Sequence, residues 1–230
     1  MAVLQKSRDG IAPGEYYHIF NRGAHRQTIF KDKTDWSRFL FNILYFQSPY
    51  PFQKISRLVQ TYAHDTGFSV PNEDIEEVLK GRFVELVGFC LMSNHFHLIV
   101  KETEEGGMAR YMQRVSDGYT KYFNTKYEAS GHVFQGSYKA VHVKTDTQLL
   151  YLSAYIHRNP REISAWRGKE FEYPWSSLQD FTEGNRWGGI IVPEIITGQF
   201  ESTPQSNYAD FVKTSPAKRI GKELEGIIPL

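Results

Sequence analysis

The sequence predicts an α+β domain, in which an antiparallel sheet carries helices packed on one face in a split βαβ (ferredoxin-like) arrangement. Two observations lead to this prediction. Short apolar runs with alternating polarity are typical of strands, and longer segments have apolar residues at helical spacing. Strands are expected at residues 14–23 and 82–102 (two strands), and a loop followed by a strand at 132–143. The main helices are expected at 33–46, 106–131 and 146–160.

The first half of the chain supplies one strand and several helices. The strand "GEYYHIFNRG" (14–23) alternates across two faces at Tyr17, His18 and Ile19. The helix at 33–46 ends where "SPYPFQ" (48–53) breaks its pattern. Residues 54–81 are expected to form one or two helices with an acidic face.

The second half supplies the remaining strands and two helices. "RFVELVGFCLMSNHFHLIVKE" (82–102) indicates two strands joined around residues 92–94, and the second is expected at a sheet edge. The helix at 106–131 is closed by Gly131, and the helix at 146–160 starts at the N-cap Asp146 and ends at Pro160. After an aromatic connector, "YPWSSLQDF", the tail is weakly patterned, and "SNYADFVK" and "GKELEGI" indicate short helices in it.

The composition indicates a globular protein. Of the 230 residues, 40% are hydrophobic and 15% aromatic, which suffices for a sizeable core. Cys90 is the single cysteine, so an internal disulfide and a cysteine-based zinc site are excluded, as is usual in a reducing cytoplasm. No segment has the length of a membrane span and residues 1–18 lack a signal-peptide core, so we expect a cytoplasmic protein without a membrane partner.

The distribution of charge indicates a nucleic-acid partner more clearly than the net charge of +1 does. Residues 106–144 hold six Lys and Arg residues, interleaved with aromatic residues, and only Asp117 and Glu128 oppose them. Such a stretch suits phosphates together with stacked bases. The alternative is a solvated helix whose aromatic face lies in the core.

"CLMSNHFHLIV" (90–100) places two histidines one residue apart in an apolar strand. Because side chains alternate along a strand, His95 and His97 point to one face, roughly 7 Å apart along the chain, and can converge on one ion. Two core histidines satisfied by hydrogen bonds are an equal alternative. Two ligands are too few for a closed metal site, so a third is needed.

Tyr151, Tyr155 and Asn159 follow at intervals of four residues and therefore share one helix face, ~6 Å apart in rise. A tyrosine phenol is a nucleophile once it loses its proton, and an amide oxygen can complete a site with two imidazoles. If this face meets the histidine strand, Asn159 joins His95 and His97. The alternatives are that Asn159 caps the helix end and that Tyr155 packs in the core.

"MSNHFHLIV" (92–100), followed by "YIHRNP" (155–160), resembles the REP-associated tyrosine transposases, which are IS200-like, single-tyrosine members of the His-hydrophobic-His (HUH) nuclease superfamily. Three further segments resemble family segments: "YHIFNRGAHRQTIF" (17–30), "GHVFQGSYKA" (131–140) and "YPWSSLQDF" (173–181). The resemblance covers residues 14 to 182 or thereabouts.

The resemblance implies an HUH-type nuclease fold and a role for each motif residue. His95 and His97 match the two metal-binding histidines, Tyr155 the nucleophile and Asn159 the third metal ligand. The implied activity is cleavage and rejoining of single-stranded DNA beside a hairpin through a 5′-phosphotyrosine intermediate. The imidazoles would permit Zn²⁺, but phosphate and amide oxygens are hard donors, which favours Mg²⁺ or Mn²⁺.

Several polar side chains are candidates for DNA contacts, although exposed Lys and Arg are ordinary surface residues. Near the motifs these are Arg22, Arg26, Lys139 and Arg158, and along the long helix Arg110, Arg114 and Lys121. Gln135 is a candidate base contact on resemblance alone. We expect a single-stranded DNA partner with hairpin-forming repeats, bound by a monomer or a homodimer.

The chain departs from the compact family pattern in two places. We expect a catalytic domain at residues 1–184 with an insertion at 47–82, followed by a C-terminal extension at 185–230. Neither departure includes a motif residue, so the resemblance informs chemistry better than specificity. A non-catalytic DNA- or RNA-binding protein on the same fold is one alternative, and a metal-dependent phosphoesterase that uses water is another.

Overall fold

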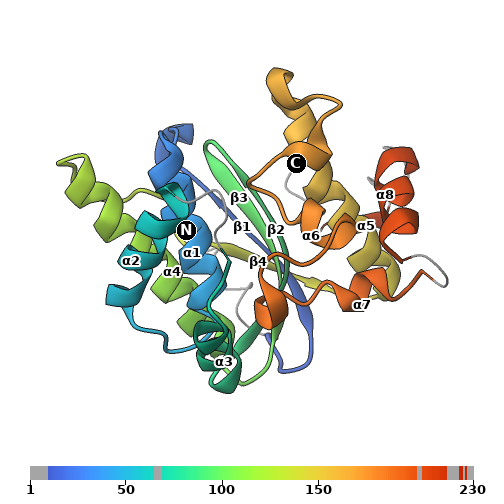
Figure 1. The fold of residues 1–230 in the computed structure, drawn as a ribbon, viewed down its shortest axis with the longest axis horizontal. Helices are drawn as coiled ribbons and strands as arrows, with labels where there is room; N and C mark the ends of the chain where they lie inside the picture. The colour runs from blue at the N-terminus through green and yellow to red at the C-terminus, as the bar shows by residue number, and fades with distance from the viewer. Residues whose placement is uncertain (1–9, 65–68, 201–203, 217–222, 225, 227–230) are drawn as a thin grey trace.

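A computed structural model describes residues 10–64, 69–200, 204–216, 223–224 and 226, with a four-stranded antiparallel sheet at the centre (Figure 1). The strands β1 (Tyr16–Arg22), β2 (Val84–Met92), β3 (His95–Glu102) and β4 (Lys139–Val143) lie in the order β2-β3-β1-β4. Every neighbouring pair is antiparallel, so the α+β class and the split βαβ arrangement are confirmed. The histidine strand β3 lies in the interior of the sheet, and its expected place at an edge is wrong.

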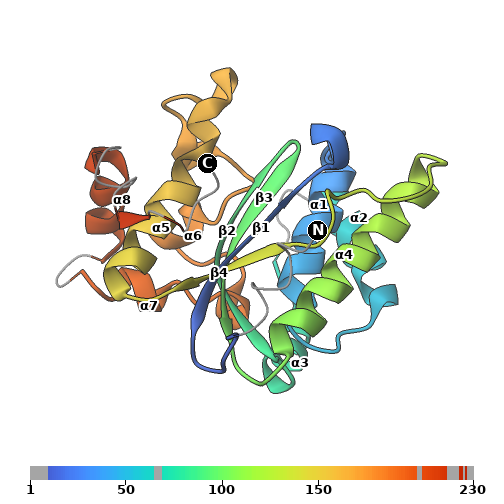
Figure 2. The same cartoon turned by 180° about the vertical axis from the view of Figure 1, so that it is seen from behind.

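One face of the sheet carries α1 (Lys33–Tyr45) and α4 (Gly107–Lys126), with α2 (Phe52–His64) and α3 (Asn72–Lys80) on the same side (Figure 2). The two inner helices bury large aromatic side chains against β3. The ring of Phe39 lies 4.8 Å from that of Phe96, and Phe39 in turn meets Tyr119 at 5.1 Å. These contacts form the larger of the two apolar cores.

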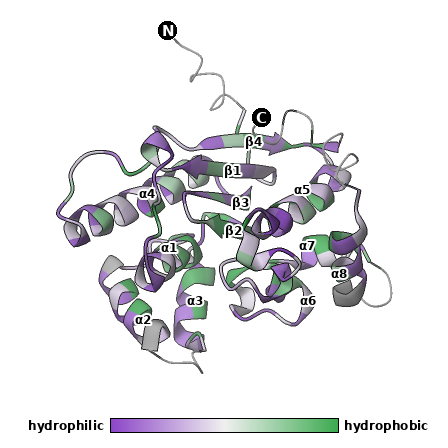
Figure 3. Cartoon of the chain, turned by 90° about the horizontal axis from the view of Figure 1, so that it is seen from above, coloured by the Kyte–Doolittle hydropathy of each residue, from purple (hydrophilic) through white to green (hydrophobic). Residues whose placement is uncertain are grey.

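The other face is covered as well, by α5 (Asp146–Arg158), α6 (Leu178–Thr182), α7 (Glu194–Thr197) and α8 (Pro204–Thr214) (Figure 3). The prediction of helices on one face only is therefore corrected. In β2 every position but one is buried, as a strand covered on both faces requires. Short 3-10 helices connect the larger elements: η1 (Ala24–Arg26), η2 (Asn159–Glu162), η3 (Ser164–Trp166), η4 (Glu170–Glu172) and η5 (Gly188–Ile190).

Local signals explain most of the helix ends. α5 begins at Thr145, whose hydroxyl accepts a hydrogen bond from the N–H of Gln148 at 3.1 Å, so Thr145 and not Asp146 is its N-cap. α5 ends at Arg158, as Pro160 predicts. α4 already ends at Lys126, before Gly131.

The predicted insertion (47–82) and the predicted C-terminal extension (185–230) both contribute described residues to the two apolar cores. Residues 54–81 contain two helices, as one of the predicted possibilities, and Ile55, Val59 and Val78 are buried in the larger core. In the tail, "SNYADFVK" lies in α8, as predicted, whereas most of "GKELEGI" falls outside the described residues. The division into a domain at 1–184 with an insertion at 47–82 and an extension at 185–230 stays a prediction.

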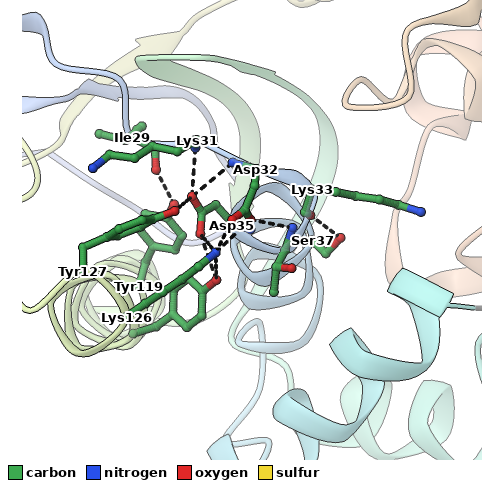
Figure 4. A network of polar contacts seen from close by, with 11 residues as sticks. Ile29, Lys31, Asp32, Lys33, Asp35, Ser37, Tyr119, Lys126 and Tyr127 are labelled. Atoms are coloured by element: carbon green, nitrogen blue, oxygen red, sulfur yellow. Dashed lines mark hydrogen bonds and ion pairs between the residues drawn. The ribbon is translucent and has the colours of Figure 1, made fainter.

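The N-terminus of α1 is joined to the C-terminus of α4 by a buried carboxylate (Figure 4). Asp35 has no exposed surface, and its two oxygens accept hydrogen bonds from Tyr122 Oη at 2.8 Å and Tyr127 Oη at 2.7 Å. The ammonium of Lys126 donates to the same carboxylate at 2.7 Å and to the N-cap residue Asp32. Each buried polar atom thus has a partner, which is what makes such a network stabilising.

We predict that Asp35→Asn lowers the free energy of unfolding by about 3 kcal/mol, because it removes the charge that faces Lys126 and one acceptor for a tyrosine hydroxyl. Urea unfolding measures the difference. Glu104→Gln is the control, since it breaks a half-exposed ion pair with Arg110, worth about 0–1 kcal/mol. Equal losses in the two variants would show that the Asp35 network is not stabilising.

α5 is tied to the tail and to β2 through His157, a fully buried residue of the "YIHRNP" motif. Its Nδ1 lies 2.6 Å from Tyr208 Oη of α8, and its Nε2 lies 2.8 Å from Ser177 Oγ. The N–H of Phe89 in β2 donates to the same Ser177 hydroxyl. Burial lowers the pKa of His157 to about 3, so the ring is neutral at pH 7.

This shift makes stability depend on pH. The unfolded chain binds a proton at His157 near pH 6.5, whereas the folded protein does so only near pH 3, so the stabilisation is complete above pH 6.5 and is lost as the pH falls towards 3. In that window His157→Gln should lower the slope of unfolding free energy against pH by about 1.4 kcal/mol per pH unit, relative to the unsubstituted protein. Urea unfolding at several pH values tests this, and equal slopes would contradict it.

Candidate functional site

Three histidine rings gather on the sheet face that α5 covers. His95 and His97 point to the same face, as predicted, with ring centroids 5.2 Å apart. His18 of β1 joins them: its Nε2 lies 2.9 Å from His97 Nδ1, and it is fully buried. The sequence placed His18 in an alternating strand, but the pairing of β1 with β3, which brings it to His97, was not visible there.

Hydrogen bonds fix both motif histidines through Nδ1. His95 Nδ1 lies 2.7 Å from Asn94 Oδ1, an acceptor, so Nδ1 carries the proton and Nε2 keeps its lone pair. In His97 the bond to His18 leaves Nε2 as the second ring nitrogen. Burial lowers the pKa of His95, with Arg22 adding to it, and burial together with His18 and His95 holds the pKa of His97 well below its ordinary value. Both rings are therefore neutral at pH 7, as metal ligands must be.

α5 brings one tyrosine to these rings. The Tyr155 ring lies edge-on to His97, with centroids 5.7 Å apart. Burial raises the pKa of its phenol, and Glu162 and Cys90 add to the shift, so the phenol is protonated at neutral pH. Tyr151, one turn earlier, is buried against Phe211 of α8 at 5.2 Å. Tyr155 is thus the tyrosine of the pair that contacts the histidine cluster.

Asn159 follows Tyr155 by one turn and is buried. Its amide nitrogen donates to the carbonyl oxygens of Tyr155 and Ile156, each at 3.3 Å, so the residue does cap the end of α5. Capping uses the nitrogen only. The amide oxygen makes no hydrogen bond within the described part of the chain, and its role as a third metal ligand stays a prediction.

The donor set is compatible with a hard divalent cation. Among the described residues, no group of three or more His, Cys, Asp or Glu side chains is arranged to hold a metal ion. The candidate donors are therefore the two Nε2 atoms of the motif histidines, with an amide oxygen as the predicted third. The amide oxygen and the phosphate oxygens are hard donors that suit Mg²⁺ or Mn²⁺, whereas the imidazole nitrogens would also permit Zn²⁺, so the choice of metal stays a prediction.

Four of the predicted DNA-contact residues lie near the histidines. Arg22 is the pairing partner of His95, and its Nε donates to Gln135 Oε1. Arg26 follows in η1. Lys139 opens β4 with its Nζ 5.8 Å from the centroid of the Phe20 ring, which itself lies 6.0 Å from the His97 ring.

The other predicted contacts are not brought to the site. Arg110 pairs with Glu104 and lies over Phe83 at the opposite end of β2. Arg114 donates to the Tyr50 carbonyl and lies over Phe46, in the core of the other sheet face. Lys121 is exposed on α4, and Arg158 donates to the Ser215 carbonyl. The three arginines are held by contacts within the fold, and the DNA role of all four residues stays a prediction.

Comparison with known proteins adds three findings. The chain matches the family model described as "Transposase IS200 like" over residues 14–159, which include His18, both motif histidines, Tyr155 and Asn159. A solved structure of a REP-associated tyrosine transposase bound to a REP hairpin is 12% identical, covers 82% of this chain and 91% of that chain, and gives a TM-score of 0.49. Comparison with curated proteins gave no match. No helix among the described residues is long and apolar enough to cross a membrane.

Proposed function

The chain belongs to the family of IS200-like transposases, and on this basis we propose that it cleaves and rejoins single-stranded DNA beside a hairpin through a 5′-phosphotyrosine intermediate. The observation that carries the proposal is the contact between the Tyr155 ring and His97, which puts a nucleophilic side chain beside a candidate metal ligand. The resemblance of the motifs to those of REP-associated tyrosine transposases makes hairpin-flanked DNA the substrate to test.

The proposed reaction is a transesterification at phosphorus. Tyr155 Oη forms a bond to the scissile phosphorus, and the bond from phosphorus to the 3′ oxygen breaks. The phenol loses a proton and the leaving 3′ oxygen gains one, so the step is balanced without ATP. Attack by the 3′-OH of another strand reverses it and joins the two strands. The raised pKa of Tyr155 means that the phenol must give up its proton as it attacks.

His95 and His97 would hold a divalent cation through Nε2, with Asn159 as the proposed third ligand. When bound, Mg²⁺ or Mn²⁺ supplies Lewis-acid polarisation of the phosphate and offsets negative charge in the transition state. Asn94 and His18 hold the two rings in one orientation, which such a site requires. Arg22, Arg26 and Lys139 are proposed to bind the DNA backbone beside it.

Tyr155→Phe should abolish the covalent protein–DNA adduct while leaving folding nearly unchanged, because the substitution removes one oxygen from a partly exposed phenol. Tyr151→Phe, one turn earlier, is the matched control and should form the adduct. The assay is incubation with a labelled DNA hairpin that carries single-stranded flanks, with Mn²⁺, followed by a denaturing gel. An adduct in Tyr155→Phe at the normal yield would refute the assignment. Cleaved DNA without an adduct would identify a hydrolase instead, and binding without cleavage a non-catalytic module.

Excess EDTA should stop cleavage but leave most DNA binding intact, since phosphate contacts supply most of the affinity.

In calorimetric titrations with Mn²⁺, His97→Ala should abolish Mn²⁺ binding, and His18→Leu should weaken it roughly 10–100-fold because the ring of His97 loses its partner. His18→Gln keeps a polar partner for His97 and should weaken binding less. His142→Gln, a partly exposed residue of the edge strand β4, is the control. Cleavage that persists in EDTA would contradict the proposed role of the metal. Unchanged Mn²⁺ affinity in His18→Leu would contradict the proposed role of His18 in orienting His97.

A further inference from the structure

A pocket of about 790 Å³ opens at the end of β1, where it is lined by Arg22, the residue that pairs with His95 of β3. Its walls come from η1 and the turn after it, from the C-terminal end of α4, and from the loop before β4. Phe123, Val133 and Phe134 are buried and give it an apolar floor. This volume is within the range of small-molecule sites, so it suits a ligand of nucleotide size better than a DNA stem.

Two arginines make the rim of the pocket positively charged. Arg22 and Arg26 line it together with His25 and His132, and no carboxylate stands among the described lining residues. Within the described part of the chain, the side chains of His25, Arg26 and His132 form no hydrogen bond or ion pair. Arg22 uses only Nε in its bond to Gln135, which leaves its two terminal nitrogens and the Gln135 amide nitrogen available. A cationic rim over an apolar floor is complementary to a phosphate attached to a planar base.

The backbone of the rim is in an unfavourable conformation. His25 and Arg26 are consecutive residues with φ of 53° and 61°. These values lie in the left-handed region, which residues other than glycine seldom adopt. Residues held in this way cluster at binding sites, where the surrounding structure enforces them. Here the enforcement comes from the neighbouring loop: the N–H of Ala24 donates to Val133 O at 2.9 Å, and Asn21 Nδ2 donates to Gly136 O at 3.1 Å.

One side chain joins the pocket to the candidate metal ligands. Asn94 accepts from His95 Nδ1 at 2.7 Å and donates through Nδ2 to the carbonyl of Arg26 at 3.3 Å. The backbone carbonyl of Asn94 also accepts from the N–H of Gly23 at 2.7 Å. The pocket loop and His95 are therefore held in a fixed relation through a single residue.

From these observations we propose that the pocket binds one unstacked nucleotide of the single-stranded flank, next to the phosphate that Tyr155 attacks. The inference rests on the proposed function and specifies its substrate contact. Arg22, Arg26 and His132 bind the phosphate of this nucleotide, and the Gln135 amide donates to the edge of its base. The link through Asn94 sets the distance from this nucleotide to the scissile phosphate.

The test distinguishes binding of the single-stranded flank from binding of the hairpin stem. Binding is measured by fluorescence anisotropy, without a divalent metal, for a DNA hairpin with single-stranded flanks of mixed sequence and for the same hairpin with a blunt end. The double variant Arg26→Ala/His132→Ala and the single variant Gln135→Ala should each bind the flanked hairpin roughly tenfold more weakly and the blunt hairpin unchanged. Arg57→Ala is the matched control, because it removes an exposed cation from α2 on the first sheet face.

Equal losses of affinity for both hairpins, or losses no larger than that of Arg57→Ala, would overturn the proposal that the pocket binds a flank nucleotide. A second measurement uses the unsubstituted protein: 4-thiothymidine in the flank should cross-link to residues 22–27 or 132–136, and cross-links confined to other peptides would also overturn it. Neither measurement needs cleavage. If the flank dependence holds but no covalent adduct forms, the pocket stands and the cleavage mechanism fails.

Discussion

The register of β1 against β3 assembles the candidate site, because it sets β1 residues beside both motif histidines. Arg22 lies opposite His95 and Phe20 opposite His97, and His18, two residues before Phe20, bonds to the His97 ring. A slip of one residue would turn the β1 side chains to the opposite face, where α1 and α4 pack. A pairing between segments distant in sequence therefore controls how both rings are held.

The two sheet faces differ in the polar groups that they bury. The core under α1 and α4 is rich in aromatic side chains and also buries Asp35, Asn42 and Gln47. The face under α5 buries polar groups inside its core, among them His18, His97 and His157. A buried ring with a partner on its nitrogen has one favoured orientation, whereas apolar packing alone tolerates several. This face can therefore hold side chains in fixed positions while remaining a packed core.

Local patterns in the sequence predicted the features that depend on neighbouring residues, such as the face of a strand side chain and the end of a helix. Strand alternation placed His95 and His97 on one face, and helical periodicity together with Pro160 located α5 and its end. What depends on distant pairing was not predicted. Val87, Cys90, Met92 and Ile99 form a second buried face, which an apolar run alone does not distinguish from a one-sided strand. The bond of His18 and the pocket between residues 22–27 and 132–136 needed the assembled fold. Arg114 was predicted to contact DNA because it lies in a basic, aromatic stretch. Its actual partner, the ring of Phe46, lies far away in the sequence and could not be predicted from that stretch.

The bonds from His157 to α8 and to Ser177 have a consequence for synthesis on the ribosome. The helix that carries Tyr155 is made before its partners Ser177 and Tyr208, so it cannot complete its packing until those later segments emerge. β1, β3, β4 and both pocket loops precede α5 in the chain and can pair earlier. During translation, the surface around the histidines should therefore form first, and the nucleophile should acquire its final position last.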